Sequence, residues 1–192
     1  MEVNLLGEVN QLSSDHHDVV VIGAGLSGLC ADIKLKAAGI DDFRVFEKAS
    51  DVGGTWRDNT YPGVACDVPS HLYSCSFAPN PDWSRWYAPG HEIQDYIRSC
   101  AVEFGVRDHI TFETSIESAT WRDDHWALVD SHGATCTARS IISALGGLHT
   151  ANEPQLPGRE LFNGDIFHTR RRPGGQACSG RRDWRDCRPG CP

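Results

Sequence analysis

A run of four apolar residues at 19–22 is the first strong hydrophobic signal along the chain, and it predicts a short buried strand. Residues 26–39 follow with their apolar side chains at the spacing of one helix face. Residues 42–47 predict a second strand that ends in an acid, Glu47. The order of strand, helix and strand is typical of an α/β fold with a parallel sheet.

The apolar pattern after residue 89 predicts one more helix and several more strands. The predicted helix covers 90–104, the predicted strands cover 110–114, 116–121, 126–129 and 138–144, and a tight turn covers 122–125. Together these elements predict an α/β domain at 18–150 with a parallel sheet and a small antiparallel strand layer. The polar, aperiodic residues 1–17 are expected to be a flexible leader.

The turn between the first strand and the first helix carries glycines in G-x-G-x-x-G spacing. Gly23 permits a tight turn, Gly25 lets a phosphate approach the backbone, and Gly28 lets the helix pack close to the strand. Leu26 and Ser27 begin the helix, whose positive end and free N–H groups suit a pyrophosphate. The stretch therefore predicts a Rossmann-like domain that binds a dinucleotide.

Glu47 is the acidic partner that such a site requires. It follows the glycines by a little over twenty residues, at the end of the second predicted strand, where its carboxylate can accept hydrogen bonds from ribose hydroxyls. An acid at this place disfavours a 2′-phosphate. FAD or NAD is therefore favoured over NADP here.

A long segment rich in glycine, proline and aromatic residues follows Glu47. A loop of this length inside a compact domain is usually functional. Gly53 and Gly54 offer bare backbone for a second approach to the cofactor, and Asp67 is a carboxylate among apolar residues, where a shifted pKa is expected. The segment's flat side chains are Trp56, Tyr61, Tyr73 and Phe77. The alternative is an aromatic cap that only packs on the sheet.

Two motifs give this chain a resemblance to a known family. Residues 53–77, G-G-T-W-R-D-N-T-Y-P-G-V-A-C-D-V-P-S-H-L-Y-S-C-S-F, resemble the flavin-contacting segment of class B flavoprotein monooxygenases, in particular Baeyer–Villiger monooxygenases. Residues 162–173 resemble the Baeyer–Villiger signature F-x-G-x-x-x-H-T-x-x-W-P, with Arg172 in place of Trp. The matching positions are Phe162, Gly164, His168, Thr169 and Pro173. The resemblance covers residue 18 to about residue 169.

The resemblance implies FAD as the bound cofactor and NADPH as the reductant. One oxygen of O₂ would be inserted next to the carbonyl of a small ketone-like substrate to give an ester or lactone. Asp67 would lie near the flavin–nicotinamide face as the candidate catalytic residue, and Ile116 would offer its backbone to the adenine. The other cofactor contacts implied are Lys48, Gly54, Thr55, Trp56, Val68, Tyr73 and Gly146.

Two alternatives stay open. One alternative is a non-catalytic FAD-binding fragment, since the family's NADPH-binding unit should open near residue 170 and is not recognisable there. An N- or S-oxygenating flavin monooxygenase is the other alternative. The family's active-site arginine would lie beyond that second unit, and Arg57, which belongs to the flavin loop, is not expected to replace it.

Composition and charge bear on possible partners, cell location and metal binding. The net charge of −8 gives no reason to expect nucleic acid, no apolar run approaches the ~20 residues of a membrane span, and no signal peptide is recognisable, so the cytoplasm is expected. No metal site is expected, because His16 and His17 are read as solvated. Five cysteines without a C-x-x-C pair are expected to be free thiols: Cys30, Cys66, Cys75, Cys100 and Cys136.

The composition changes abruptly at residue 170. The following 23 residues contain seven arginines and three cysteines but no Val, Ile, Leu or Phe, so residues 174–192 are expected to be a disordered tail after a linker at 151–173. One interpretation is a basic arm, and a second is a zinc site at Cys178, Cys187 and Cys191, which lacks a fourth ligand. The favoured interpretation is a shifted reading frame, because residues 180–191 can be retranslated as a strand and a G-x-G-x-x-A turn.

Overall fold

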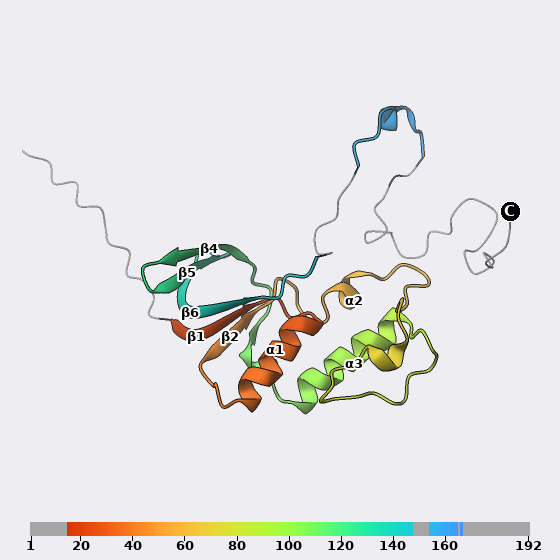
Figure 1. Cartoon of the computed structure of the whole chain (residues 1–192). Helices are drawn as coiled ribbons and strands as arrows, with labels where there is room; N and C mark the ends of the chain where they lie inside the picture. The colour runs from red at the N-terminus through yellow and green to blue at the C-terminus, as the bar shows by residue number, and fades with distance from the viewer. Residues whose placement is uncertain (1–14, 148–153, 165, 167–192) are drawn as a thin grey trace, which may run out of the picture.

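A computed structural model of the chain describes residues 15–147, 154–164 and 166. These residues form a six-stranded sheet in the order β3-β2-β1-β6-β5-β4 (Figure 1). The strands are β1 His16–Ile22, β2 Phe43–Phe46, β3 Ile110–Thr111, β4 Ile116–Arg122, β5 His125–Asp130 and β6 Thr135–Ser143. The helices are α1 Leu26–Ala37, α2 Thr55–Asp58 and α3 Gly90–Glu103, with short 3₁₀ turns at Ser70–Leu72, Arg107–His109 and Arg159–Leu161.

The sheet is parallel on one side and antiparallel on the other. β1 pairs in parallel with both β2 and β6, and β2 pairs in parallel with β3. β5 pairs in antiparallel fashion with β6 and β4. The α/β prediction is confirmed, but the antiparallel strands continue the same sheet. They do so because β6 is long enough to pair with β1 and with β5.

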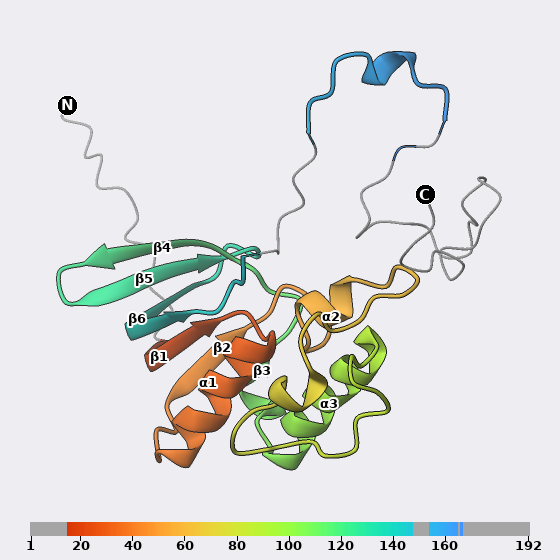
Figure 2. The ribbon, with the colours of Figure 1, turned by 45° about the vertical axis from the view of Figure 1, so that its right-hand side comes forward.

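Alternation along β1 explains how the sheet buries two faces. Val21 belongs to the large core beneath α1 and α3, whereas Val20 belongs to a smaller core with Leu128 and Ala138 on the other face. Both views show α1 and α3 side by side over one face of the sheet (Figures 1 and 2). The glycine turn between β1 and α1 is thereby held at the carboxyl edge of the strands.

Several boundaries differ from the sequence predictions. β1 begins at His16, inside the predicted leader, because β1 continues its parallel pairing with β6 to this residue. The histidines are paired rather than simply solvated: the His16 ring lies 2.9 Å from Thr137 Oγ1, and the His17 ring lies 3.1 Å from Asp42 Oδ1.

β3 covers only Ile110–Thr111, where a strand to residue 114 was predicted. The backbone of Glu113 has φ 55°, which takes the chain out of the sheet, and its N–H donates to the Ala49 carbonyl. The tight turn is also shorter than predicted, since His125 already pairs with Arg122 in the β4–β5 hairpin.

No helix in the described part of the chain is long and apolar enough to cross a membrane. The same residues contain no group of three or more His, Cys, Asp or Glu side chains placed to hold a metal ion. The leader at 1–14 and the predicted tail at 174–192 lie outside the described residues.

Candidate functional site

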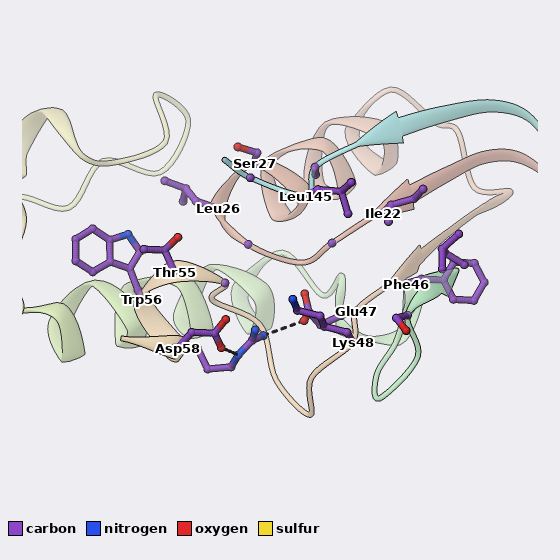
Figure 3. A pocket seen from close by; sticks show the side chains of 18 of the residues that line it. Ile22, Leu26, Ser27, Phe46, Glu47, Lys48, Thr55, Trp56, Asp58 and Leu145 are labelled. Atoms are coloured by element: carbon purple, nitrogen blue, oxygen red, sulfur yellow. Dashed lines mark hydrogen bonds and ion pairs between the residues drawn. The ribbon is translucent and has the colours of Figure 1, made fainter. Parts of the chain in front are cut away.

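A cavity of about 450 Å³ opens at the carboxyl edge of β1, β2 and β6, beside the N-terminus of α1 (Figure 3). A cavity of this size falls in the range of small-molecule and cofactor sites. Twelve of the residues predicted from the sequence line it: Gly23, Gly25, Leu26, Ser27, Glu47, Lys48, Gly54, Thr55, Trp56, Tyr73, Ile116 and Gly146. These residues come from segments far apart in the sequence, and the sheet brings them to one place.

The glycine turn is packed too tightly for side chains at two positions. A Cβ on Gly28 would collide with the carbonyl oxygen of Gly23, so this glycine permits the close packing of α1 on the end of β1, as predicted. Gly23 has φ 101°, and a Cβ there would lie 2.7 Å from the Ala144 carbonyl oxygen. The turn therefore depends on both glycines.

Gly25 and Gly54 bring two backbones together at the floor of the cavity. A Cβ on Gly54 would lie 3.0 Å from the Gly25 Cα, whereas a Cβ on Gly25 would lie at an ordinary 3.7 Å from the Gly54 Cα. Gly25 itself has φ −72°, a value open to any residue. The bare backbone of Gly25 thus faces the cavity without being required by the protein's own packing.

The N-terminus of α1 presents a positive end to the cavity. No side chain caps this 12-residue helix, and its first turn contains no acidic residue. Leu26 and Ser27 of that turn line the cavity. Free N–H groups and the helix dipole at this position favour an anion such as a phosphate.

Glu47 is buried at the end of β2, with 4% of its surface exposed. Its Oε2 accepts the Ala24 N–H at 2.8 Å, and its Oε1 accepts the Ala49 N–H at 3.0 Å. Oε1 also pairs with Arg57 Nη1 at 3.1 Å, which Figure 3 draws as a dashed line. The carboxylate is therefore fixed beside the glycine turn by the protein's own donors.

Two aromatic residues, Trp56 and Tyr73, form an aromatic wall of the cavity. The Trp56 indole N–H donates to the Tyr73 hydroxyl at 2.9 Å, and the two rings meet edge to face with centroids 5.5 Å apart. Both rings also pack against the large core. The predicted aromatic cap and the cavity wall therefore coincide at Trp56 and Tyr73, whereas Tyr61 and Phe77 do not line the cavity.

Known proteins share both the sequence and the fold. Residues 21–89 match the NAD(P)-binding Rossmann-like domain family. A Baeyer–Villiger monooxygenase of Streptomyces coelicolor is 45% identical over 159 residues, 82% of this chain and 30% of that protein. A Baeyer–Villiger monooxygenase of Pseudomonas aeruginosa is 44% identical over 156 residues, 80% of this chain and 30% of that protein. Over about 80% of its length, this chain is similar in sequence to Baeyer–Villiger monooxygenases.

Solved structures of Baeyer–Villiger-type enzymes agree with this relationship. Oxidized steroid monooxygenase bound to NADP superposes with a TM-score of 0.74 at 41% identity and covers 83% of this chain and 32% of its own. Cyclohexanone monooxygenase bound to ε-caprolactone superposes with a TM-score of 0.77 at 37% identity, over 88% of this chain and 34% of its own. The chain spans about 30% of the length of the curated relatives it matches.

Asp67 and Val68, taken from the Baeyer–Villiger resemblance, lie outside the cavity lining. Both side chains are exposed, so the expected apolar neighbourhood of Asp67 is wrong. The preceding residue, Cys66, takes the buried position, and its N–H donates to the Ala88 carbonyl at 2.8 Å. The chain alternates here, and Asp67 therefore faces outward.

Sequence reasoning missed several residues of the cavity wall. They are Ile22, Phe46, Arg57, Asp58, Asn59, Thr114, Ser115, Ala144 and Leu145. Arg57 had a signal, since it stands inside the G-G-T-W-R stretch that carries the Baeyer–Villiger resemblance. Thr114 had none, because its position follows from a hydrogen bond of its N–H to the Glu47 carbonyl at 2.9 Å.

The five cysteines of the domain are free thiols, as predicted. The sequence pattern did not indicate that two of them, Cys75 and Cys100, interact with the hydroxyl of Tyr96, or that Cys30 interacts with Cys75. Burial raises the pKa of the Cys75 and Cys100 thiols. Most of the fingerprint after Gly164, including His168 and Thr169, lies outside the described residues, as do the tail cysteines.

Proposed function

We propose that this cavity binds FAD as part of an FAD- and NADPH-dependent monooxygenase, which inserts one oxygen atom of O₂ next to a ketone carbonyl. The observation that carries the proposal is the meeting of an uncapped helix N-terminus, a bare glycine floor and a buried, fixed carboxylate in one cavity. The names of the relatives, among them an FAD-binding monooxygenase of Aspergillus terreus at 42% identity, support the same assignment.

The residues present fit the dinucleotide part of FAD. The pyrophosphate would lie against the first turn of α1, where the Gly25–Gly54 floor leaves room that a Cβ would fill. Glu47 would accept a hydrogen bond from the ribose, and the backbone of Ile116 would lie near the adenine. Gly146 would let the chain after β6 pass the phosphates.

The flavin end would lie toward the aromatic wall. FAD, when bound, supplies the ring that takes electrons from NADPH and reacts with O₂. Trp56, Tyr73 and Thr55 would orient that ring and keep water from one side of it. Asp67 and Val68 stay predicted contacts of the flavin face, as the resemblance implies. None of the described residues is assigned here to NADPH, the ketone or O₂.

The test is a titration of the purified chain with FAD, followed by flavin fluorescence. Gly25→Ala is the informative variant, because the new Cβ fits the protein itself but fills the space proposed for the phosphate. We expect wild type to bind and Gly25→Ala to lose affinity at least tenfold, at an unchanged melting temperature. Gly147→Ala is the matched control, since a Cβ there meets nothing within 4 Å. Equal affinity of all three proteins would contradict the proposal.

A second candidate is an FAD-binding chain without turnover of its own. It rests on the same cavity, which by itself accounts for FAD binding and not for turnover. The two candidates separate once FAD is bound: NADPH oxidation stimulated by cyclohexanone, used as a ketone probe, supports the monooxygenase. Bound FAD with no NADPH oxidation supports the second candidate.

A further inference from the structure

Arg57 connects two walls of the cavity. Its side chain is 14% exposed; Nη1 donates to Glu47 Oε1 at 3.1 Å and to the Asp51 carbonyl, and Nε donates to Asp58 Oδ1 at 2.8 Å. Figure 3 shows the dashed lines at Glu47 and Asp58. Arg57 lies on α2 directly after Trp56, which lines the cavity. The contact therefore joins the aromatic wall to the acid at the end of β2.

The contacts of Glu47 leave one of its oxygens less occupied than the other. A carboxylate has about four acceptor positions, two on each oxygen. Oε1 accepts hydrogen bonds from the Ala49 N–H and from Arg57, whereas among the described residues Oε2 accepts one, from the N–H of Ala24. Oε2 therefore retains an acceptor position beside the glycine turn.

We propose that Arg57 is a positioning residue that holds the Glu47 carboxylate so that Oε2 accepts the ribose hydroxyl of the adenosine half. The inference rests on the proposed binding of FAD. It assigns Arg57 a role through Glu47 and no contact with the reacting atoms. Because Arg57 also holds α2, it links the ribose end of the site to the flavin end.

Guanidinium geometry, in addition to charge, is what this role requires. Arg57 serves three oxygens with two nitrogens held in one plane, and a lysine ammonium is a single point charge on a flexible stem. Lys at this position would keep a positive charge near the buried carboxylate. It would not hold Glu47, Asp58 and the Asp51 carbonyl at once. Arg57→Lys thus separates positioning from simple neutralisation.

The experiment is a double-mutant cycle on FAD affinity with the full chain. The proteins are wild type, Glu47→Gln, Arg57→Gln, Arg57→Lys and the double variant Glu47→Gln/Arg57→Gln. Loss of a charge-assisted hydrogen bond typically costs tenfold or more in binding, so we expect Arg57→Gln to weaken FAD binding roughly tenfold. The double variant should bind no more weakly than Glu47→Gln, because Arg57 acts only through that carboxylate.

Melting curves without FAD test folding in every variant. We expect Arg57→Lys to melt near wild type yet to bind FAD roughly tenfold more weakly. Arg139→Gln is the matched control, since it removes an exposed ion pair between Arg139 on β6 and Asp18 on β1, and neither residue lines the cavity. Its affinity should equal wild type.

The outcomes separate this inference from the proposed function. If the losses of FAD affinity in the two single variants simply add in the double variant, Arg57 contacts the cofactor directly and the inference is overturned. Wild-type FAD affinity in Arg57→Lys would also overturn it. In both cases wild type still binds FAD, and the proposed function stands. Wild type that binds no FAD, with an intact melting transition, overturns the proposed function first.

Discussion

Asp32 is a carboxylate that the fold buries without compensation, and its removal should stabilise the protein. It lies on α1 with 0% of its surface exposed, and neither carboxylate oxygen has a hydrogen-bond partner among the residues that the structure describes. Burial raises its pKa from 3.8 to about 7, although Lys36, one turn further along α1, opposes the shift. The charged form is therefore costly in the folded state.

The sign of the pH dependence follows from the raised pKa. Below pH 3.8 the carboxyl is protonated in both states and ionisation costs nothing. As the pH rises toward 7, the unfolded chain loses this proton while the folded chain keeps it, so the free energy of unfolding falls. At about 1.4 kcal/mol per pKa unit, a shift from 3.8 to about 7 amounts to roughly 4 kcal/mol above pH 7.

Asp32→Asn isolates this cost, because asparagine keeps the shape and the polarity but cannot ionise. We expect Asp32→Asn to exceed wild type by less than about 1 kcal/mol at pH 4, where the unfolded aspartate is only partly ionised, and by roughly 4 kcal/mol at pH 8. Urea unfolding followed with tryptophan fluorescence measures both differences. Asp32→Ala should be more stable than wild type at both pH values, since it also removes the unpaired polar group. Parallel stability curves for wild type and Asp32→Asn between pH 4 and 8 would refute the reasoning.

Three further predictions concern residues in and around the cavity. Gly28→Ala should fail to give a cooperative melting transition, because its Cβ meets the Gly23 carbonyl, whereas Gly147→Ala should melt as wild type. Asp51→Asn should lower the free energy of unfolding at pH 7 by about 1–2 kcal/mol. Burial alone would raise the pKa of Asp51, but its pairing with Arg107 and Arg98 outweighs burial and lowers that pKa. The loss should vanish as the pH falls through the lowered pKa, and a loss independent of pH would contradict this prediction. Trp56→Phe and Tyr73→Phe each remove the same hydrogen bond, so the missing bond should lower the free energy of urea unfolding by about 1 kcal/mol in either variant. The double variant should lose this contribution only once.

The local order of the chain was readable from sequence because it depends on neighbours in the sequence. The apolar run at 19–22, the glycines after it and Glu47 determine a strand, a turn, a helix and a second strand through periodicity and backbone freedom alone. The same pattern predicted five members of the cavity lining, Gly23, Gly25, Leu26, Ser27 and Glu47, since parallel strands bring their carboxyl ends to one edge. The resemblance to Baeyer–Villiger monooxygenases implied the other seven.

Other features were decided only by packing between distant segments. The pairing of Arg57 with Glu47, the burial of Asp32 and the gathering of Cys30, Cys75 and Cys100 all depend on which helix faces meet. Asp67 turned outward for the same reason, because Cys66 took the buried position. A linear pattern records the type and spacing of side chains, but partner, burial and acceptor geometry arise only when residues far apart in the chain share one volume.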